Sequence, residues 1–152
     1  MSKLSWGKPL VEFTKSVNGA PSTEPAAVWT AFSEIKEGTA QLTVEEGEKV
    51  QATEEGGEVI DTRVKKNKYI FELQLFAKKG DEKPIEDADG IISENYAVRL
   101  TPEDNACEGF LIENATVTLQ ETWNAADGKL WLYRFSAIKP QSGNTLKPYT
   151  KA

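Results

Sequence analysis

Hydrophobic and polar side chains alternate along several long segments of this chain. Between Asn67 and Phe76 every second position is aromatic or leucine, namely Tyr69, Phe71, Leu73 and Leu75. The same period returns over 115–123 and over 130–138. A two-residue period is typical of β-strands that bury one face. The pattern therefore predicts a mainly β protein.

Shorter strands are predicted before and between these segments, over 10–14, 28–35, 41–45, 49–53, 58–64 and 96–100. The residues 124–128, between the last two long segments, are typical of a hairpin turn. Glu46-Gly47-Glu48 predicts a second hairpin, between the strands on either side of it. Glu54-Glu55-Gly56-Gly57 predicts a turn or a bulge before the next strand.

Three segments rich in turn residues or charges are predicted to be loops or tail: 18–25, 78–90 and 140–152. One short helix is predicted from Pro102 to Cys107, because Thr101 resembles an N-cap and proline favours the first helical position. We therefore expect a single β domain over residues 1–152. Its expected architecture is an antiparallel β-sandwich or barrel of about eight to ten strands with one short helix.

Composition narrows the chemistry. The chain has 152 residues, of which 39% are hydrophobic and 28% charged, with no histidine and one cysteine, Cys107. Without histidine the usual zinc and iron sites are excluded, and the thiol has no imidazole to activate it. The best calcium-loop match, at 87–90, has Ile85 where its first ligand should stand. We expect no catalytic residue, no metal and no cofactor. A hydrolase that uses a pair of glutamates remains one alternative function, after the two that are described below.

No apolar stretch is long enough to span a bilayer, and the N-terminal residues lack the apolar core of a signal peptide. A cytoplasmic protein with no membrane partner is expected. The formal net charge of -6 and the isoelectric point near 4.8 argue against a protein that grips phosphates. The same values are compatible with a protein that DNA passes without being bound.

Charge is unevenly distributed along the chain. Between Thr43 and Glu58 the local charge is -5, and the acidic residues are Glu45, Glu46, Glu48, Glu54, Glu55 and Glu58. From Lys129 to the C-terminus it is +5, and the basic residues are Lys129, Arg134, Lys139, Lys147 and Lys151. Both regions suit a solvated surface. They also suit a heterologous contact in which the acidic region of one copy meets the basic region of the next.

The four tryptophans allow a different function. Trp6, Trp29, Trp123 and Trp131 could line a carbohydrate platform on a β-sandwich. Most lie at alternating strand positions, where core packing is the ordinary explanation. A β-sandwich module that binds carbohydrate or another ligand through exposed tryptophans is therefore the alternative prediction.

The order of features from Val28 to Pro140 resembles that of phage major tail tube proteins and of the related type VI secretion tube protein. The resemblance lies in the short segment 35–39, the acidic glycine-containing hairpin that ends at 54–57, the strand from Tyr69 to Phe76, the turn Asp127-Gly128 and the short segment 137–140. A tube subunit usually has a helix of a few turns, whereas this chain offers only Pro102 to Cys107.

The resemblance implies a subunit that assembles with itself into hexameric rings, which stack into a tube for DNA passage and contact other tail proteins. It implies a place in the virion tail, and in the host cytoplasm during assembly. The segments 41–58 and 78–90 are the candidate arms between subunits, and both are expected to be mobile in a free subunit. An acidic lumen would repel DNA and let it pass without specific binding.

Overall fold

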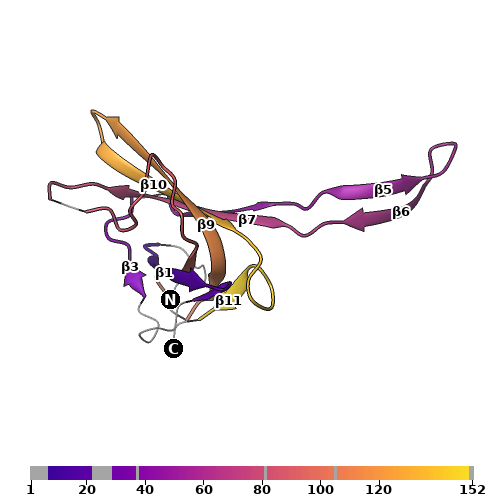
Figure 1. Cartoon of the computed structure of the whole chain (residues 1–152), viewed down its shortest axis with the longest axis horizontal. Helices are drawn as coiled ribbons and strands as arrows, with labels where there is room; N and C mark the ends of the chain where they lie inside the picture. The colour runs from indigo at the N-terminus through magenta and orange to yellow at the C-terminus, as the bar shows by residue number, and fades with distance from the viewer. Residues whose placement is uncertain (1–6, 22–28, 37, 81, 105, 151–152) are drawn as a thin grey trace.

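The computed structural model describes residues 7–21, 29–36, 38–80, 82–104 and 106–150. Within this part the protein consists of eleven β-strands, and none of the described residues is helical. Nine strands form one antiparallel sheet that curls into an open half-barrel. The other two form a hairpin that projects far from this sheet (Figure 1).

The curled sheet has the strand order β2-β1-β8-β9-β10-β7-β4. These strands are β1 (Leu10–Val17), β2 (Ala20–Pro21), β4 (Gln41–Glu45), β7 (Lys68–Phe76), β8 (Tyr96–Thr101), β9 (Gly109–Asn124) and β10 (Gly128–Ala137). Two short strands join from the side: β3 (Thr30–Ala31) pairs with β1, and β11 (Lys147–Tyr149) pairs with β9. The projecting hairpin consists of β5 (Lys49–Thr53) and β6 (Val59–Val64).

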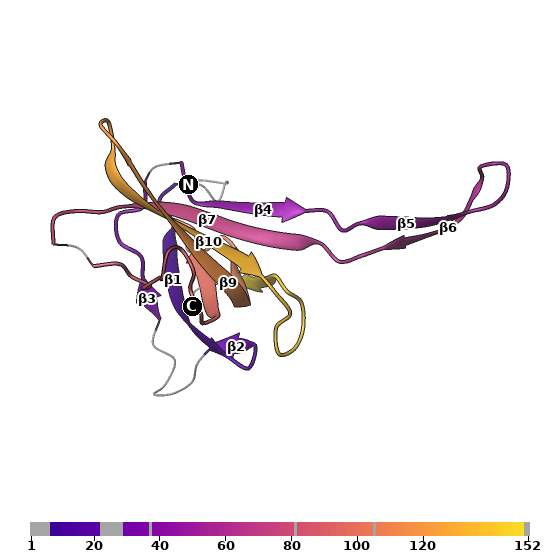
Figure 2. The ribbon, with the colours of Figure 1, turned by 45° about the horizontal axis from the view of Figure 1, so that its top comes forward.

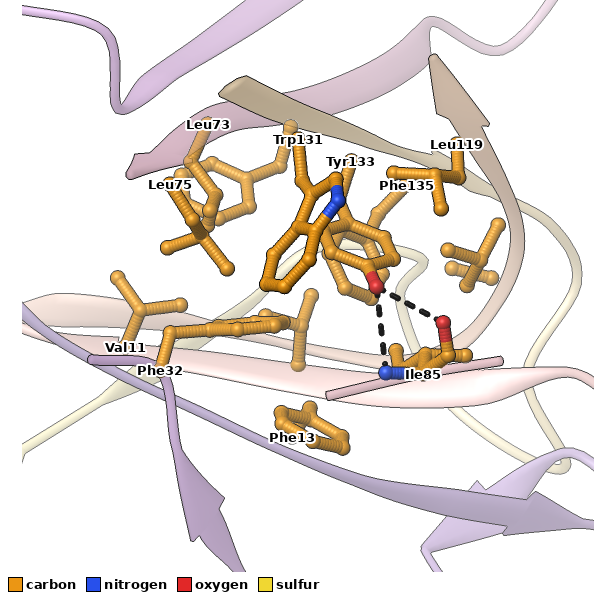
Figure 3. Packing of buried hydrophobic residues seen from close by; sticks show 14 of the residues in the cluster. Val11, Phe13, Phe32, Leu73, Leu75, Ile85, Leu119, Trp131, Tyr133 and Phe135 are labelled. Atoms are coloured by element: carbon orange, nitrogen blue, oxygen red, sulfur yellow. Dashed lines mark hydrogen bonds between the residues drawn. The ribbon is translucent and has the colours of Figure 1, made fainter. Parts of the chain in front are cut away.

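The core lies inside the curl of the sheet, and the alternation along the strands creates it. Tyr133 of β10 lies opposite Leu119 of β9 on one side and Leu73 of β7 on the other. All three side chains are buried, so three adjacent strands contribute to the same layer (Figure 3). The pairing of β9 with β10 confirms the two strands and the hairpin that are predicted for the C-terminal third of the chain.

A short segment crosses the gap between the two edges of the curled sheet. At its beginning Phe32 donates a backbone hydrogen bond to Val11 of β1, and at its end Lys36 donates one to Gln74 of β7. The side chain of the same Phe32 packs into the core, with its ring centroid 4.5 Å from that of Phe13 and 5.8 Å from that of Tyr133. The segment therefore covers the open side of the half-barrel with an aromatic side chain.

The strand pairs β4–β7 and β5–β6 follow one another along a single extended two-stranded structure (Figure 2). The chain leaves the sheet along β4 and β5, reverses at residues 54–57 and returns along β6 and β7. We call residues 45–68 the arm. The prediction of a turn at Glu54-Glu55-Gly56-Gly57 is confirmed, since the arm reverses there.

The hairpin predicted at Glu46-Gly47-Glu48 is wrong. β4 pairs with β7 and β5 pairs with β6, so these three residues connect two strands that continue in the same direction. Gly47 is needed there for close approach: a Cβ atom on it would lie 1.7 Å from the carbonyl oxygen of Lys65. Gly47 therefore lies where the two chains of the arm come closest together. The sequence analysis interprets the same glycine as part of a turn that reverses the chain.

The described residues of the predicted helix from Pro102 to Cys107 are not helical either. The chain has only a turn there, in which Cys107 donates a backbone hydrogen bond to Asp104 and the Asp104 side chain accepts one from the Ala106 amide. Thr101 belongs to β8 instead of capping a helix. Residues that favour helix N-termini also favour such turns, and β9 begins at Gly109, too soon for a helix to form.

The predicted sandwich or barrel is corrected to the open half-barrel, because the β5–β6 pair stands outside the sheet and cannot close it. Two predicted irregular segments contain short strands: β2 lies within 18–25, and β11 lies within 140–152. Residues 22–25 and 151–152 lie outside the described part of the chain. The described residues of the segment 78–90 contain no named strand, although Ala88 forms an isolated bridge with Ile91.

Candidate assembly surface

The arm is the most exposed part of the molecule. Every residue from Glu48 to Lys68 is exposed, including four large aliphatic side chains on β5 and β6: Val50, Val59, Ile60 and Val64. Ile60 is 66% exposed. Single apolar side chains on a surface are ordinary, but this set lies on one slender element with no core beneath it. The arm therefore carries apolar surface that the free chain leaves in water.

The backbone of the arm is equally open. β5 and β6 pair only with each other among the described strands, so each has one edge whose amide and carbonyl groups face no other described strand. An isolated two-stranded hairpin is at best marginally stable in water. Open edges of this kind are the usual sites at which another chain adds a strand. Geometry and exposure together make the arm a candidate assembly surface.

Local contacts nevertheless keep the two strands of the arm in register. At its narrow point Lys65 donates a backbone hydrogen bond of 2.9 Å to Glu48, and the Gly47 amide donates one of 3.0 Å to the Asn67 side chain. The Lys65 Nζ atom lies 3.4 Å from a carboxylate oxygen of Glu48. These bonds join the β4–β7 pair to the β5–β6 pair, so the arm continues directly from the sheet.

The tip of the arm is a tight acidic turn. Glu54 donates a backbone hydrogen bond to Glu58 and accepts one from Gly57. Gly56 and Gly57 both have positive φ angles, 105° and 96°, which glycine adopts without strain. Glu54, Glu55 and Glu58 therefore come together at the end of the arm, and none of them forms an ion pair with another described residue.

The structure places all six predicted acidic residues on the arm. Glu45 ends β4, Glu46 and Glu48 flank the narrow point, and the other three form the tip. Glu46 lies 3.6 Å from Lys49, and Glu48 pairs with Lys65 as described. The acidic region is therefore a long projecting element, with its uncompensated charge concentrated at the far end.

The predicted basic residues do not gather into one surface. Lys129 lies near the start of β10 and Lys139 lies two residues beyond its end, so roughly 33 Å of extended chain separates them. Three of the five pair with acids across strands: Lys129 with Glu121, Arg134 with Glu72, and Lys147 with Glu113. Lys139 forms no ion pair within the described chain, and Lys151 lies outside it. Three of these five basic residues are thus paired with acidic residues on neighbouring strands.

The second candidate arm, 78–90, is anchored to the body. It follows the end of β7 and extends from the body on the side opposite the arm before it returns (Figure 2). Ile85 is 2% exposed in the core, where the Tyr133 hydroxyl donates to its carbonyl at 2.8 Å and accepts from its amide at 3.2 Å (Figure 3). Burial raises the pKa of Tyr133 to about 12. The sequence analysis predicts a mobile arm here and does not identify Ile85 as its anchor.

Charged groups hold the same loop against β9. Lys83 lies 2.8 Å from Asp87 and 2.6 Å from Glu121. Hydrogen bonding to Lys83 lowers the pKa of both carboxyl groups, and the pKa of Lys83 is raised by the same two bonds. The Gly90 amide donates a further bond of 2.7 Å to Asp87. This arrangement fastens the loop and leaves 45–68 as the principal projection.

The three tryptophans in the described part of the chain do not form a platform. Trp131 is buried in the core at 6% exposure, and the guanidinium of Arg99 lies 4.2 Å from the centroid of the Trp29 ring. Trp123, near the turn between β9 and β10, is 72% exposed. Trp6 lies outside the described residues. One exposed ring gives no set of stacked aromatic surfaces, so the alternative of a carbohydrate-binding module gains no support here.

Among the described residues, no group of three or more acidic or cysteine side chains is placed to hold a metal ion. No helix long and apolar enough to cross a membrane occurs in the same part of the chain.

The fold resembles that of a solved protein from an injection machine. The similar chain comes from the cryo-EM structure of the PVC extracellular contractile injection system, described as its sheath/tube terminator in the extended state. The TM-score is 0.51 and the sequence identity 9%, with 92% of this chain and 93% of the other covered. No protein-family model matches the sequence, and no curated protein matches it. The likeness is therefore one of fold.

Proposed function

We propose that this protein is a structural subunit of a phage tail or of a related contractile injection machine, and that it assembles through its arm. The observation that carries the proposal is the arm itself, an exposed two-stranded extension with aliphatic side chains and open strand edges. The fold of a tail terminator protein, shared over nearly the whole chain, supports the same class of machine.

The arm would act by mechanical attachment. Burial of its valine and isoleucine side chains against a neighbour supplies the hydrophobic contribution, and its open edges supply backbone hydrogen bonds. An arm that meets a different surface on the next copy makes a heterologous contact, and such contacts close into rings or continue as filaments. We propose a ring of copies, hexameric as the resemblance to tube proteins implies, in contact with other tail proteins.

Two positions in the tail agree with these features. A tube subunit would stack ring upon ring around passing DNA, and acidic side chains on the lumen would repel the DNA and prevent it from sticking. A terminator-like subunit would form one ring at the end of the tube, as the fold similarity favours. In either position the protein acts without catalysis, and it belongs to the tail after assembly in the host cytoplasm.

The direct test is to shorten the arm. In this variant an Asn-Gly dipeptide replaces residues 46–67 and joins β4 to β7 with a short turn. We expect the full chain to form rings or stacked rings at high concentration, seen by negative-stain microscopy and light scattering. We expect the shortened chain to stay monomeric with the same circular dichroism midpoint, because the removed residues contribute no core.

A pair of point variants provides the matched control. Ile60→Thr removes an exposed side chain from the arm, and Ile91→Thr removes one of similar exposure, 66% against 70%, from the body. We expect Ile60→Thr to weaken association by about tenfold and Ile91→Thr to leave it unchanged. A full chain that stays monomeric at every concentration would rule the proposal out. Stacked tubes would favour the tube subunit, and single rings the terminator.

A further inference from the structure

A small groove lies where the arm leaves the body. Its walls come from the base of the arm, at Lys66, Asn67 and Lys68, and from the end of β10 with the loop after it, over residues 137–143 and Thr145. Its volume is about 360 Å³. Figure 2 shows this loop, between β10 and β11, on the side of the body from which the arm extends. We call this feature the root groove.

The root groove is basic and uncompensated. Lys66, Lys68 and Lys139 line it, and no residue that lines it is acidic. None of these three lysines forms an ion pair with another described residue, whereas Lys65, between two of them, pairs with Glu48 on the arm. Glu45 lies opposite Lys68 in the strand register without an ion pair between them. Three lysines that form no ion pair with a described residue thus line one hollow.

The apolar part of the groove suits a peptide turn. Ala137, Ile138 and Pro140 contribute to its walls, and Ile138 is 37% exposed. The arm ends in a narrow turn that carries Glu54, Glu55 and Glu58, with Val59 and Ile60 directly behind them. The turn and the groove therefore carry charges of opposite sign, three uncompensated charges each, and both have apolar side chains beside the charges.

The arm cannot place its tip in its own groove. From Glu58 back to Lys66 the extended strand covers roughly 26 Å, and Figures 1 and 2 both show the tip far out from the body. A contact between the two features therefore requires two molecules. Within each molecule the tip and the root lie at opposite ends of one element, so the contact would set a fixed spacing between neighbours.

We propose that the acidic tip of the arm of one copy, Glu54, Glu55 and Glu58, docks into the root groove of the next copy, against Lys66, Lys68 and Lys139. This inference rests on the proposed function and names the partner surface for the arm. The contact is head-to-tail, because each copy offers its tip to one neighbour and its groove to another. Repetition around an axis gives a ring.

The test uses charge reversal on each side. The groove variant carries Lys66→Glu and Lys139→Glu, and the tip variant carries Glu55→Lys and Glu58→Lys. We expect each alone to weaken association by about tenfold or more, since like charges then face each other. A mixture of the two variants should assemble again, because the tip of each variant then carries a charge opposite in sign to that of the groove of the other.

Matched controls carry the same charge changes elsewhere. Lys8→Glu with Lys79→Glu reverses two exposed lysines that form no ion pair within the described chain, and Glu86→Lys with Glu108→Lys reverses two exposed glutamates of the same kind. We expect both control variants to associate as the unaltered chain does. Circular dichroism establishes that each variant is folded, and the recovery in the mixture shows this independently.

The outcomes separate this inference from the proposed function. If the unaltered chain assembles and the arm-shortened chain does not, but the groove variant assembles normally or the mixture fails to recover, the proposed function stands and tip-to-groove docking is wrong. If the unaltered chain never associates, both are wrong. If a labelled DNA oligonucleotide binds the unaltered chain and not the groove variant, while assembly is unaffected by the charge reversals, the groove is a phosphate site and the inference is overturned.

Discussion

Tyr133 shows how one residue makes a charged, irregular loop part of the core. It lies in the middle of β10, is fully buried, and forms hydrogen bonds with both backbone groups of Ile85. Sequence alternation predicted that Tyr133 faces the core. It could not predict that the hydroxyl meets Ile85, because the two residues are 48 positions apart and the loop has no period from which its position can be read.

Removal of this hydroxyl should destabilise the protein. In Tyr133→Phe the ring remains, but the amide and the carbonyl of Ile85 lose their partner in a buried place. Such losses cost about 1–3 kcal/mol in free energy of unfolding, which urea denaturation measures. Tyr69→Phe is the control, since no hydrogen bond of the Tyr69 hydroxyl to another described residue is present. Equal stabilities for the two variants would contradict the role given to Tyr133.

Lys83 leads to a prediction about acid. Its hydrogen bonds lower the pKa of Asp87 and of Glu121 from ordinary values of 3.8 and 4.5. A carboxyl group with a lowered pKa in the folded state stabilises the fold above its ordinary pKa, and this contribution is lost as pH falls through the lowered value. We expect urea midpoints to fall between about pH 5 and pH 3, and to fall less steeply in Lys83→Met.

The control for that experiment is Lys79→Met, which changes an exposed lysine with no ion pair to any described residue. Its midpoints should follow those of the unaltered chain at every pH. A slope in Lys83→Met as steep as in the unaltered chain would show that other carboxyl groups cause the acid sensitivity.

The arm shows what the sequence reveals about an element and what it leaves open. The strands 41–45, 49–53 and 59–64 were predicted nearly at their observed bounds, and so was the turn at their far end. The pairing partners of these strands could not be predicted. β5 and β6 are exposed on both faces, and neither face carries a continuous apolar pattern that fixes a partner. The sequence shows that the six glutamates lie close together along the chain, but their place on a projecting arm required the three-dimensional structure.

Exposure of the arm should appear in its hydrogen exchange. In the monomer, at low concentration, we expect the amides of β5 and β6 to exchange almost as fast as unfolded peptides, since few buried contacts support them. Amides of residues 130–136 in β10, in the middle of the core, should be strongly protected. Assembly should protect the arm and leave β10 unchanged. Protection of the arm as strong as that of β10 in the monomer would contradict an unsupported hairpin.

At the scale of the whole molecule, the charges act in two opposite ways. Each copy carries a formal net charge of -6, so copies repel one another over distances that salt screens. The tip and the root groove carry opposite charges and attract at short range. The open sheet and the long arm separate these effects in space, because the tip lies far from the negative body to which it belongs.

The response of assembly to salt therefore distinguishes which effect dominates. If tip-to-groove docking holds the copies together, an increase in sodium chloride from about 0.05 to 0.5 M should weaken association by roughly tenfold. The groove variant should show the opposite response, because salt then only screens repulsion. Sedimentation at several salt concentrations measures both. If salt instead strengthens the association of the unaltered chain, the exposed aliphatic side chains of the arm supply most of the contact and the ionic part is minor.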